Sequence, residues 1–415
     1  MSVKFSKDLQ YYRFCLYGFL KNLRFFEVFL LLFFLDKGLS FFEIGTLYAI
    51  REITINIIEI PTGIIADSVG RRRMMIIAFV FYIFSFIVFY FSATYFLFLL
   101  AMILFSFGDG IRSGNHKAMI LDYLAIKGWE DQKINYYGHT RSWSQIGSAI
   151  ASVIGALIVF YTGSYKQIFL FSIIPYLLDL INIISYPKVL DGNIQKLNTK
   201  KIKQNFKVVF KELKYSFKNA VVLKAIANYS FYSGYYKAVK DYLQPVLKMF
   251  AVSLPVLLYL DDKQRTSIVV GITFFIIYFL NSFASKYSGR IAGKFKNIYR
   301  PLNLTLIIGY IAGMISGLFF EFNLIAISII FFIGILVLEN IRKPMGVSYI
   351  GKLLDKKIFA TTFSVNSQVQ SLIAALLAPL IGFFADKFGV GISLIIVSVV
   401  LIITAPVYFV RRNKS

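Results

Sequence analysis

Long apolar runs, separated by short polar turns, dominate this chain and limit the folds that it can adopt. Many of them approach the roughly 20 residues that a helix needs to cross the hydrocarbon core of a membrane. They are continuous and do not alternate at every second residue, which favours helices over the strands of a barrel. The chain is 58% hydrophobic, above the roughly 45–50% of a soluble protein. The sequence therefore predicts an all-α membrane protein.

Twelve candidate transmembrane helices follow one another along the 415 residues. They lie at about 11–35, 40–66, 74–93, 95–122, 138–162, 167–186, 222–250, 266–288, 302–320, 323–342, 361–384 and 390–410. The longest polar stretch separates the sixth from the seventh, and it is rich in lysine (Lys196, Lys200, Lys201, Lys203, Lys207, Lys211, Lys214 and Lys218). We therefore expect an N-terminal six-helix bundle at 1–187, a basic cytoplasmic linker at 188–221 and a C-terminal six-helix bundle at 222–415.

The basic residues predict the orientation of these helices. With the N-terminus inside, most of the 45 Lys and Arg lie in inner segments, and the outer turns are short and poor in cations. The N-terminal segment before the first span is short and polar, so we expect a retained helix and no cleaved signal peptide. These observations predict a multi-pass protein of the cell (inner) membrane with both termini cytoplasmic. The net charge of +24 then serves membrane insertion, which argues against a nucleic-acid partner.

Few residues are available for cofactor, metal or disulfide chemistry. Cys15 is the single cysteine, and the two histidines are His116 and His139. We expect no disulfide, metal or cofactor. A multispan membrane enzyme remains an alternative, but it would need a cluster of catalytic or metal-binding residues near one membrane face. The sequence shows no such cluster.

The turn between the second and third spans has an unusual composition for a membrane loop. Gly63, Asp67 and Gly70 are spaced at steps of four and three, and Arg71, Arg72 and Arg73 follow directly. Glycines at 63 and 70 would let two helix ends and a tight turn approach closely. Asp67 could accept from a helix N-terminus or pair with an arginine. A simpler interpretation is that the arginines only obey the positive-inside rule, but that leaves the Gly-x-x-x-Asp-x-x-Gly frame unexplained.

This frame resembles the signature loop between helices 2 and 3 of the major facilitator superfamily, Gly-x-x-x-Asp-x-x-Gly-Arg-Arg/Lys-x-Arg/Lys. Gly63, Asp67, Gly70, Arg71 and Arg72 match it, whereas Met74 replaces the final basic residue. The six-plus-six plan and the basic linker fit the same family. The resemblance implies two pseudo-symmetric bundles that rock around a central site. It also implies a monomer, and a conformational latch formed by the five matching residues.

Ionisable groups inside the spans indicate where a substrate and protons could bind. Each costs at least about 2.5–3.5 kcal/mol at the membrane centre, so it should face protein or a water-filled cavity. The resemblance places helices 1, 4, 7 and 10 around the cavity. Our candidates for the cavity and for coupling are Arg24, Glu27, Glu52, Glu59, Asp109, Arg112, His116, Arg141, Tyr232, Tyr236, Lys240, Asn366 and Gln370.

Structural interpretations of the same residues stay open. Asp109 and Arg112 are one turn apart and could be a static pair as readily as a coupling site. Glu52 and Glu59 are more easily explained by pairing with Arg51 or with the first span than by proton carriage. Helical spacing also suggests a pair between Lys237 and Asp241. The tyrosines of the seventh span are more often packing groups than ligand contacts.

The sequence thus favours a secondary active transporter of a small organic solute, coupled to protons through Asp109, Glu52 or Glu59. Export is favoured over uptake on family abundance alone, and the alternative is an uptake symporter of an anionic or zwitterionic nutrient. The excess of cations at depth predicts better tolerance of anionic or zwitterionic, partly aromatic solutes than of simple cations. A passive channel or lipid scramblase would not need the latch. Small residues on the fifth span (Ser144, Gly147, Ser148, Ala151, Ser152 and Gly155) predict a close-packed helix face.

Overall fold

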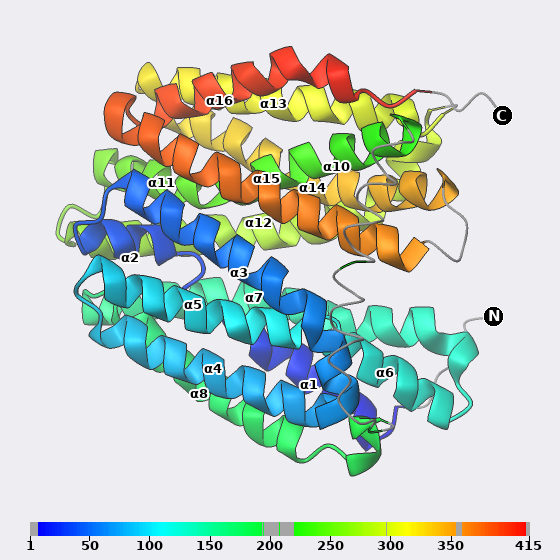
Figure 1. Ribbon diagram of the computed structural model, residues 1–415. Helices are drawn as coiled ribbons and strands as arrows, with labels where there is room; N and C mark the ends of the chain where they lie inside the picture. The colour runs from blue at the N-terminus through cyan, green and yellow to red at the C-terminus, as the bar shows by residue number, and fades with distance from the viewer. Residues whose placement is uncertain are drawn as a thin grey trace. The chain divides into compact units, whose positions relative to one another are not determined.

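The computed structural model describes residues 7–192, 194, 207, 220–295, 297–353 and 359–411. Across these residues the chain is almost entirely helical and contains no strand (Figure 1). It divides into two compact units. Unit 1 comprises Met1–Phe29 and Thr54–Phe206, and unit 2 comprises Leu30–Ile53 and Lys207–Ser415. The predicted boundaries at 187 and 222 remain predictions, and the lysines of the basic linker, apart from Lys188 and Lys207, lie outside the described residues.

Unit 1 contains most of the first six predicted spans. Its elements are α1 (Leu9–Lys21), the second half of α3 (Phe41–Val69), α4 (Arg71–Phe91), α5 (Tyr95–Arg112), α6 (Asn115–Ile126), η1 (Glu130–Gln132), α7 (Lys133–Thr162), α8 (Gln167–Ile184) and η2 (Lys188–Asp191). Within it, α4 packs against α5 and α8, and α1 packs against α7 and α8. The candidate residues from Arg24 to Arg141, apart from Glu52, all belong to this unit.

Unit 2 contains the last six predicted spans and a segment from the start of the chain. Its elements are α2 (Leu30–Asp36), the first half of α3, α10 (Ala220–Val239), η3 (Lys240–Tyr242), α11 (Leu243–Ser253), α12 (Asp262–Gly293), α13 (Tyr299–Glu321), α14 (Ile325–Leu353), α15 (Phe359–Phe388), α16 (Val390–Thr404) and η4 (Ala405–Tyr408). Within it, α13 packs against α14 and α16, and α10 packs against α15.

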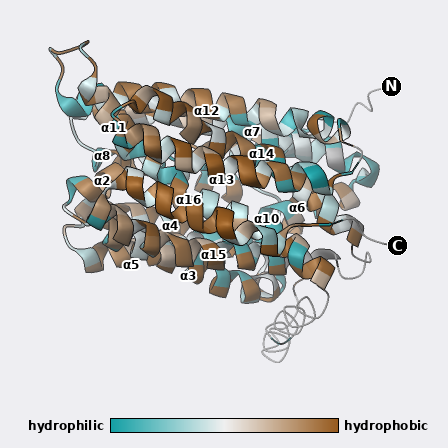
Figure 2. Cartoon of the chain, turned by 90° about the horizontal axis from the view of Figure 1, so that it is seen from above, coloured by the Kyte–Doolittle hydropathy of each residue, from teal (hydrophilic) through white to brown (hydrophobic). Residues whose placement is uncertain are grey.

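Nine helical segments of the described chain are long and apolar enough to cross a membrane. At most half of the most apolar stretch of each segment is buried within the protein. The remaining apolar side chains can therefore face lipid. Figure 2 shows hydrophobic residues along the length of the helices and hydrophilic ones gathered towards their ends. The all-α membrane architecture is thus confirmed, whereas the count of twelve crossings stays a prediction.

The first, fourth and seventh spans are broken, although we predicted each as one continuous helix. The first leaves α-helical geometry between Lys21 and Leu30, the fourth turns at Gly114 with φ of +77°, and the seventh passes through the short η3. The sequence offers a glycine only at the fourth break. At the first break, tertiary contacts satisfy some of the freed backbone groups, as a membrane interior requires.

The contacts at the first break come from distant side chains. The Tyr176 hydroxyl donates to the Lys21 carbonyl at 3.0 Å. At the start of α2, the backbone N–H groups of Leu31 and Leu32 donate to Gln244 Oε1 at 2.9 and 3.3 Å. These bonds replace helical ones and hold the chain in its broken path.

The small residues of α7 let α1 approach closely. A Cβ atom built on Gly147 would lie 2.5 Å from the Phe19 carbonyl oxygen, and one on Gly155 would lie 2.7 Å from the Phe25 carbonyl oxygen. On the other side, a Cβ atom on Gly18 would meet the Thr140 carbonyl oxygen at 2.9 Å. The predicted close-packed face is therefore confirmed, and it positions the residues of the cavity described next.

Candidate functional site

A buried charge network ties the first break to α5. Asp109 accepts from Arg24 Nη2 at 2.8 Å and from Arg112 Nη2 at 3.2 Å, and the Tyr82 hydroxyl also donates to it. Arg24 Nε further donates to the Tyr176 hydroxyl at 3.0 Å. Arg24 and Asp109 are both buried. The contact between Asp109 and Arg112, one of the two possibilities left open above, is present, and Arg24 is a second partner that helical spacing could not reveal.

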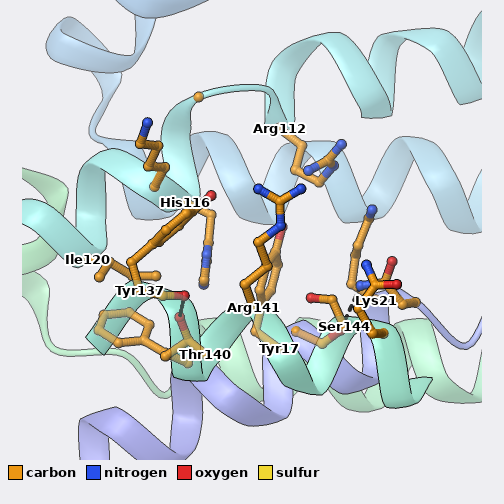
Figure 3. A pocket seen from close by; sticks show the side chains of 15 residues that line it. Tyr17, Lys21, Arg112, His116, Ile120, Tyr137, Thr140, Arg141 and Ser144 are labelled. Carbon is orange, nitrogen blue, oxygen red and sulfur yellow. Dashed lines mark hydrogen bonds between the residues drawn. The ribbon is translucent and has the colours of Figure 1, made fainter. Parts of the chain in front are cut away.

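Beside this network lies a cavity of about 370 Å³ within unit 1. Its walls come from α1, the α5–α6 turn, α6 and α7, and Figure 3 shows the side chains around it. Four cationic side chains line it, namely Lys21, Arg112, Lys117 and Arg141, together with His116. No carboxylate is found among the cavity-lining residues of the described chain. The structure thus brings together Arg112, His116 and Arg141 from our candidates and adds two lysines.

Three of these cations have no counter-ion among the residues that the structure describes. Lys21, Lys117 and Arg141 form no ion pair with any described residue, and Lys117 Nζ instead lies 5.7 Å from the centre of the Tyr137 ring. His116 stacks on Tyr17, with ring centroids 3.6 Å apart. The cavity therefore combines uncompensated positive charge with an aromatic wall.

A smaller cavity of about 200 Å³ lies in unit 2 and contains the candidates Glu52, Tyr236 and Lys240. Glu52 accepts from Lys237 Nζ at 2.8 Å, and the same Nζ contacts Ser371 Oγ at 2.9 Å. The predicted pair of Lys237 with Asp241 is wrong: the lysine points across to α3 and α15 instead of along its own helix. Arg51, one of the partners suggested for Glu52, lies within electrostatic reach of it and lines the same cavity, but the hydrogen-bonded partner is Lys237, which the sequence did not suggest.

The remaining candidates occupy bundle interiors or their edges. Glu59 accepts from Ser113 Oγ at 2.7 Å, and Glu27 lies half-buried in the first break. The Tyr232 hydroxyl donates to the Ile335 carbonyl at 3.1 Å, while Asn366 Oδ1 accepts from Ser230 Oγ at 3.0 Å. Tyr232, Asn366 and half-buried Gln370 line neither cavity, so for Tyr232 the packing interpretation fits best.

The loop between α3 and α4 forms its ion pairs within unit 1. Arg71 pairs with Asp67 at 3.3 Å and also contacts Asp122 of α6. Arg72 Nε lies 3.5 Å from the Asp191 carboxylate, and its Nη1 donates to the Ile184 and Tyr186 carbonyls. The Arg73 backbone N–H donates to Asp191 Oδ1 at 3.2 Å. Asp191, which follows α8, therefore binds the N-terminal turn of α4.

The two glycines of this loop differ in their surroundings. Gly70 has φ of +105°, and a Cβ atom there would lie 2.6 Å from Asp191 Oδ1. Gly63 is exposed and has no atom within 4 Å of such a Cβ. The close approach that we expected at Gly63 is wrong, because α3 continues as a helix to Val69 and the turn begins only at Gly70.

We therefore expect Gly70→Ala to destabilise the protein and Gly63→Ala to leave it unchanged or slightly more stable. A side chain at positive φ is strained by roughly 1–3 kcal/mol, whereas alanine in a helix is favoured over glycine by about 1 kcal/mol. Thermal unfolding in the same detergent measures both variants. Equal unfolding temperatures for the two would contradict this assignment.

Sequence reasoning missed several contributors to these sites. Asp191 lies beyond the last apolar residue of its span, so nothing local marks it as a helix cap. Lys21 and Lys117 were visible as charges within spans, and the helical spacing of Lys21 with Tyr17 and Arg24 was the available signal. Which neighbouring helix each charge faces depends on packing, which a single sequence does not contain.

Comparisons with known proteins agree with this architecture. The family model of the Major Facilitator Superfamily matches residues 15–338. The "uncharacterized MFS-type transporter YxaM" of Bacillus subtilis (strain 168) is 24% identical over 385 residues, covering 91% of this chain and 89% of the relative.

Solved transporters share the fold at low sequence identity. A bacterial homologue of the human lysosomal transporter Spinster, in an inward-facing and unoccupied conformation, has a TM-score of 0.74 and 15% identity, covering 98% of this chain and 97% of that one. A D-xylose–proton symporter has a TM-score of 0.72 and 15% identity, covering 97% of each chain. The chain therefore belongs to the major facilitator superfamily, as a multi-pass membrane transporter and not an enzyme.

Proposed function

We propose that this secondary transporter carries a small organic anion, or the acidic end of a zwitterion, together with a proton. The observation that supports this proposal is the unit 1 cavity, with four cationic side chains and no carboxylate among its described lining residues. Its volume of about 370 Å³ lies within the range of small-molecule sites. We propose Arg112, His116 and Arg141 as contacts of the substrate, joined by Lys21 and Lys117.

Electrostatics makes this cavity selective by charge. An uncompensated cation inside a membrane protein is costly; half-buried Lys21 is such a cation, and a bound anion would offset that cost. A cationic solute would add like charge to a site of low dielectric, which costs further free energy. The Tyr17–His116 stack offers an aromatic wall, and Thr140 and Ser144 line the same cavity with hydroxyl groups. An aromatic or planar acid matches this lining.

The charge of the solute also bears on direction. Moving one negative charge inward against an inside-negative potential costs about 2.3 kcal/mol per 100 mV. An anion needs a co-transported proton to enter, whereas the potential alone drives it out. We therefore propose proton symport into the cell, and export, which the sequence favoured, becomes the alternative that flux direction tests.

The three carboxylates expected to carry the proton each have a defined partner. Asp109 accepts hydrogen bonds from two arginines and a tyrosine hydroxyl. We therefore propose that Asp109 has a static, structural role. Glu52 pairs with Lys237, and Glu59 accepts from Ser113. We propose that Glu52 and Lys240, which line the unit 2 cavity, form a second candidate site there. Because each of these carboxylates already has a partner, we propose that another residue binds the coupled proton.

For the α3–α4 loop we propose the conformational role implied by its resemblance to the family signature. Its Arg71–Asp67 pair is partly exposed, since the side chains are 23% and 50% exposed. Such pairs are individually weak and can break during a transport cycle. We further propose a monomer in the cell membrane with both termini cytoplasmic.

Charge selectivity can be tested with solutes of similar size and permanent charge. We expect benzenesulfonate to raise the thermal unfolding temperature of the purified transporter and to accumulate in proteoliposomes when the outside is acidic. Phenyltrimethylammonium should do neither. Liposomes without protein are the control. Equal competition by the cation and the anion would refute the proposed substrate class, and accumulation only under an opposed proton gradient would support export.

A further inference from the structure

Asp179 of α8 is a fully buried acid that the preceding sites do not use. We propose that Asp179 is the proton-binding carboxylate of the transport cycle, and that Asp179 and the transported anion alternate as the counter-charge of Lys21. This inference rests on the proposed function, because it assumes an anionic substrate. It names the group that takes up the coupled proton.

The surroundings of Asp179 suit a neutral carboxyl group better than a charged one. Its exposed fraction is 0%, and Oδ1 accepts from Asn182 Nδ2 at 3.1 Å. Oδ2 has no hydrogen-bond partner, and Asp179 forms no ion pair, among the described residues. A buried ionised carboxylate with a single neutral partner costs several kcal/mol. Binding a proton removes that cost, so this conformation corresponds to the protonated form.

Lys21 is a cation close to this carboxyl group: Tyr176, one turn before Asp179 on α8, donates a hydrogen bond to the Lys21 carbonyl at 3.0 Å, and Lys21 lies within electrostatic reach of Asp179. The titratable or charged groups on the elements packed against α8, and on the segment that follows it, include Arg13, Tyr17 and Lys21 of α1, Tyr82 of α4, His139 and Arg141 of α7, and Tyr186. Arg13 approaches Asn182 through its backbone carbonyl, which accepts from Asn182 Nδ2 at 3.1 Å. The Tyr82 hydroxyl is engaged by Asp109, and the two α7 groups are exposed. The lysine is therefore the natural counter-ion when the carboxyl group loses its proton.

Lys21 can serve two partners because it also lines the basic cavity. It has no ion pair among the described residues, and its ammonium group sits on a flexible four-carbon stem. When the cavity holds an anion, that anion neutralises the ammonium group. When the cavity is empty, an ionised Asp179 can do so.

Charge balance then links the proton to the solute. In the loaded carrier, Lys21 is positive, the monoanion is negative and Asp179 is protonated, so the three groups sum to zero. After the anion leaves, the Asp179 O–H bond breaks, the proton follows into the same solution, and the carboxylate pairs with Lys21, again summing to zero. One proton and one anion therefore move together, and net transport is electroneutral.

Asp179→Asn should uncouple the movement of the anion from the movement of the proton. Asparagine is similar in shape but cannot lose a proton, so Lys21 keeps no internal counter-ion. We expect proton-driven accumulation of benzenesulfonate to fall at least about tenfold, while exchange of internal for external benzenesulfonate continues. Asp131→Asn, an exposed change in the same unit, should accumulate like the wild type. Wild-type accumulation by Asp179→Asn, or parallel loss of exchange and accumulation, would overturn the proposal.

A second measurement needs no substrate and separates failure of this inference from failure of the proposed function. Infrared difference spectra recorded at stepped pH should show a protonated-carboxyl band in the wild type that is missing in Asp179→Asn. In Lys21→Gln the band should persist to higher pH, because the stabilising cation is gone. If the band is absent from the wild type, or if Lys21→Gln leaves its pH range unchanged, the assignment of Asp179 is wrong even where benzenesulfonate binds. If Asp179→Asn does not fold, the Lys21→Gln comparison still decides.

Discussion

Asp109→Asn should lose most of the folded transporter and not merely its coupling to protons. The substitution removes the carboxylate that Arg24 and Arg112 share at 2.8 and 3.2 Å. Leaving a buried charge without its partner costs about 3–5 kcal/mol, a large part of a typical stability of about 5–15 kcal/mol. We expect low yield of monodisperse protein on size-exclusion chromatography and a strongly lowered thermal unfolding temperature in detergent.

Two further variants make this result interpretable. Glu59→Gln changes a half-buried carboxylate whose partner is the neutral Ser113 hydroxyl, so it should cost about 1 kcal/mol or less. Adding Arg24→Gln to Asp109→Asn removes one of the stranded charges and should restore part of the stability. If Asp109→Asn were as stable as Glu59→Gln and lost only proton movement, the static role proposed for Asp109 would be wrong.

Neutralising Lys21 and Arg141 together should weaken benzenesulfonate binding at least about 100-fold. A hydrogen bond to a charged group contributes about 1.5–3 kcal/mol, and each 1.4 kcal/mol changes affinity tenfold. The two residues come from different helices, α1 and α7, and neither has an ion pair among the described residues. Their loss therefore removes attraction for the solute without breaking an ion pair of this conformation, and Asp179 can stay protonated when Lys21 is replaced.

The matched control removes two positive charges from the surface of the same unit. Lys133→Gln with Lys188→Gln changes the net charge equally, and both lysines are exposed and lie outside the cavity. Thermal-shift titrations with benzenesulfonate should place this control close to the wild type. An unchanged affinity in Lys21→Gln with Arg141→Gln would mean that the anion binds elsewhere.

The sequence predicted the architecture well because that part of the problem is local. Continuous apolar runs identify membrane helices, and the turn around Gly70 carries its own constraint in a positive φ. The pairing of Asp67 with an arginine was one of two possibilities for this residue, and the partner, Arg71, lies at i,i+4 spacing. Such features depend on neighbours a few residues apart, which one sequence displays directly.

Partners between helices were harder to predict. Arg24 and its partner Asp109 are 85 positions apart in the sequence, and Lys237 and its partner Glu52 are 185 positions apart. Helical spacing suggested Asp241 as the partner of Lys237, but the lysine crosses to another helix. Asp179 was visible only as one more acid at depth, since the absence of a partner for its Oδ2 is a property of the folded bundle.

The capping of α2 by Gln244 bears on how the protein is made. Leu31 and Leu32 receive their hydrogen-bond acceptor from a residue more than 200 positions later, so the broken path of the first span cannot be completed while the ribosome has produced only the opening helices. The nascent segment should enter the bilayer as an ordinary continuous helix and acquire its interruption once α11 arrives. Biogenesis would then include a late remodelling step in the earliest segment to be inserted.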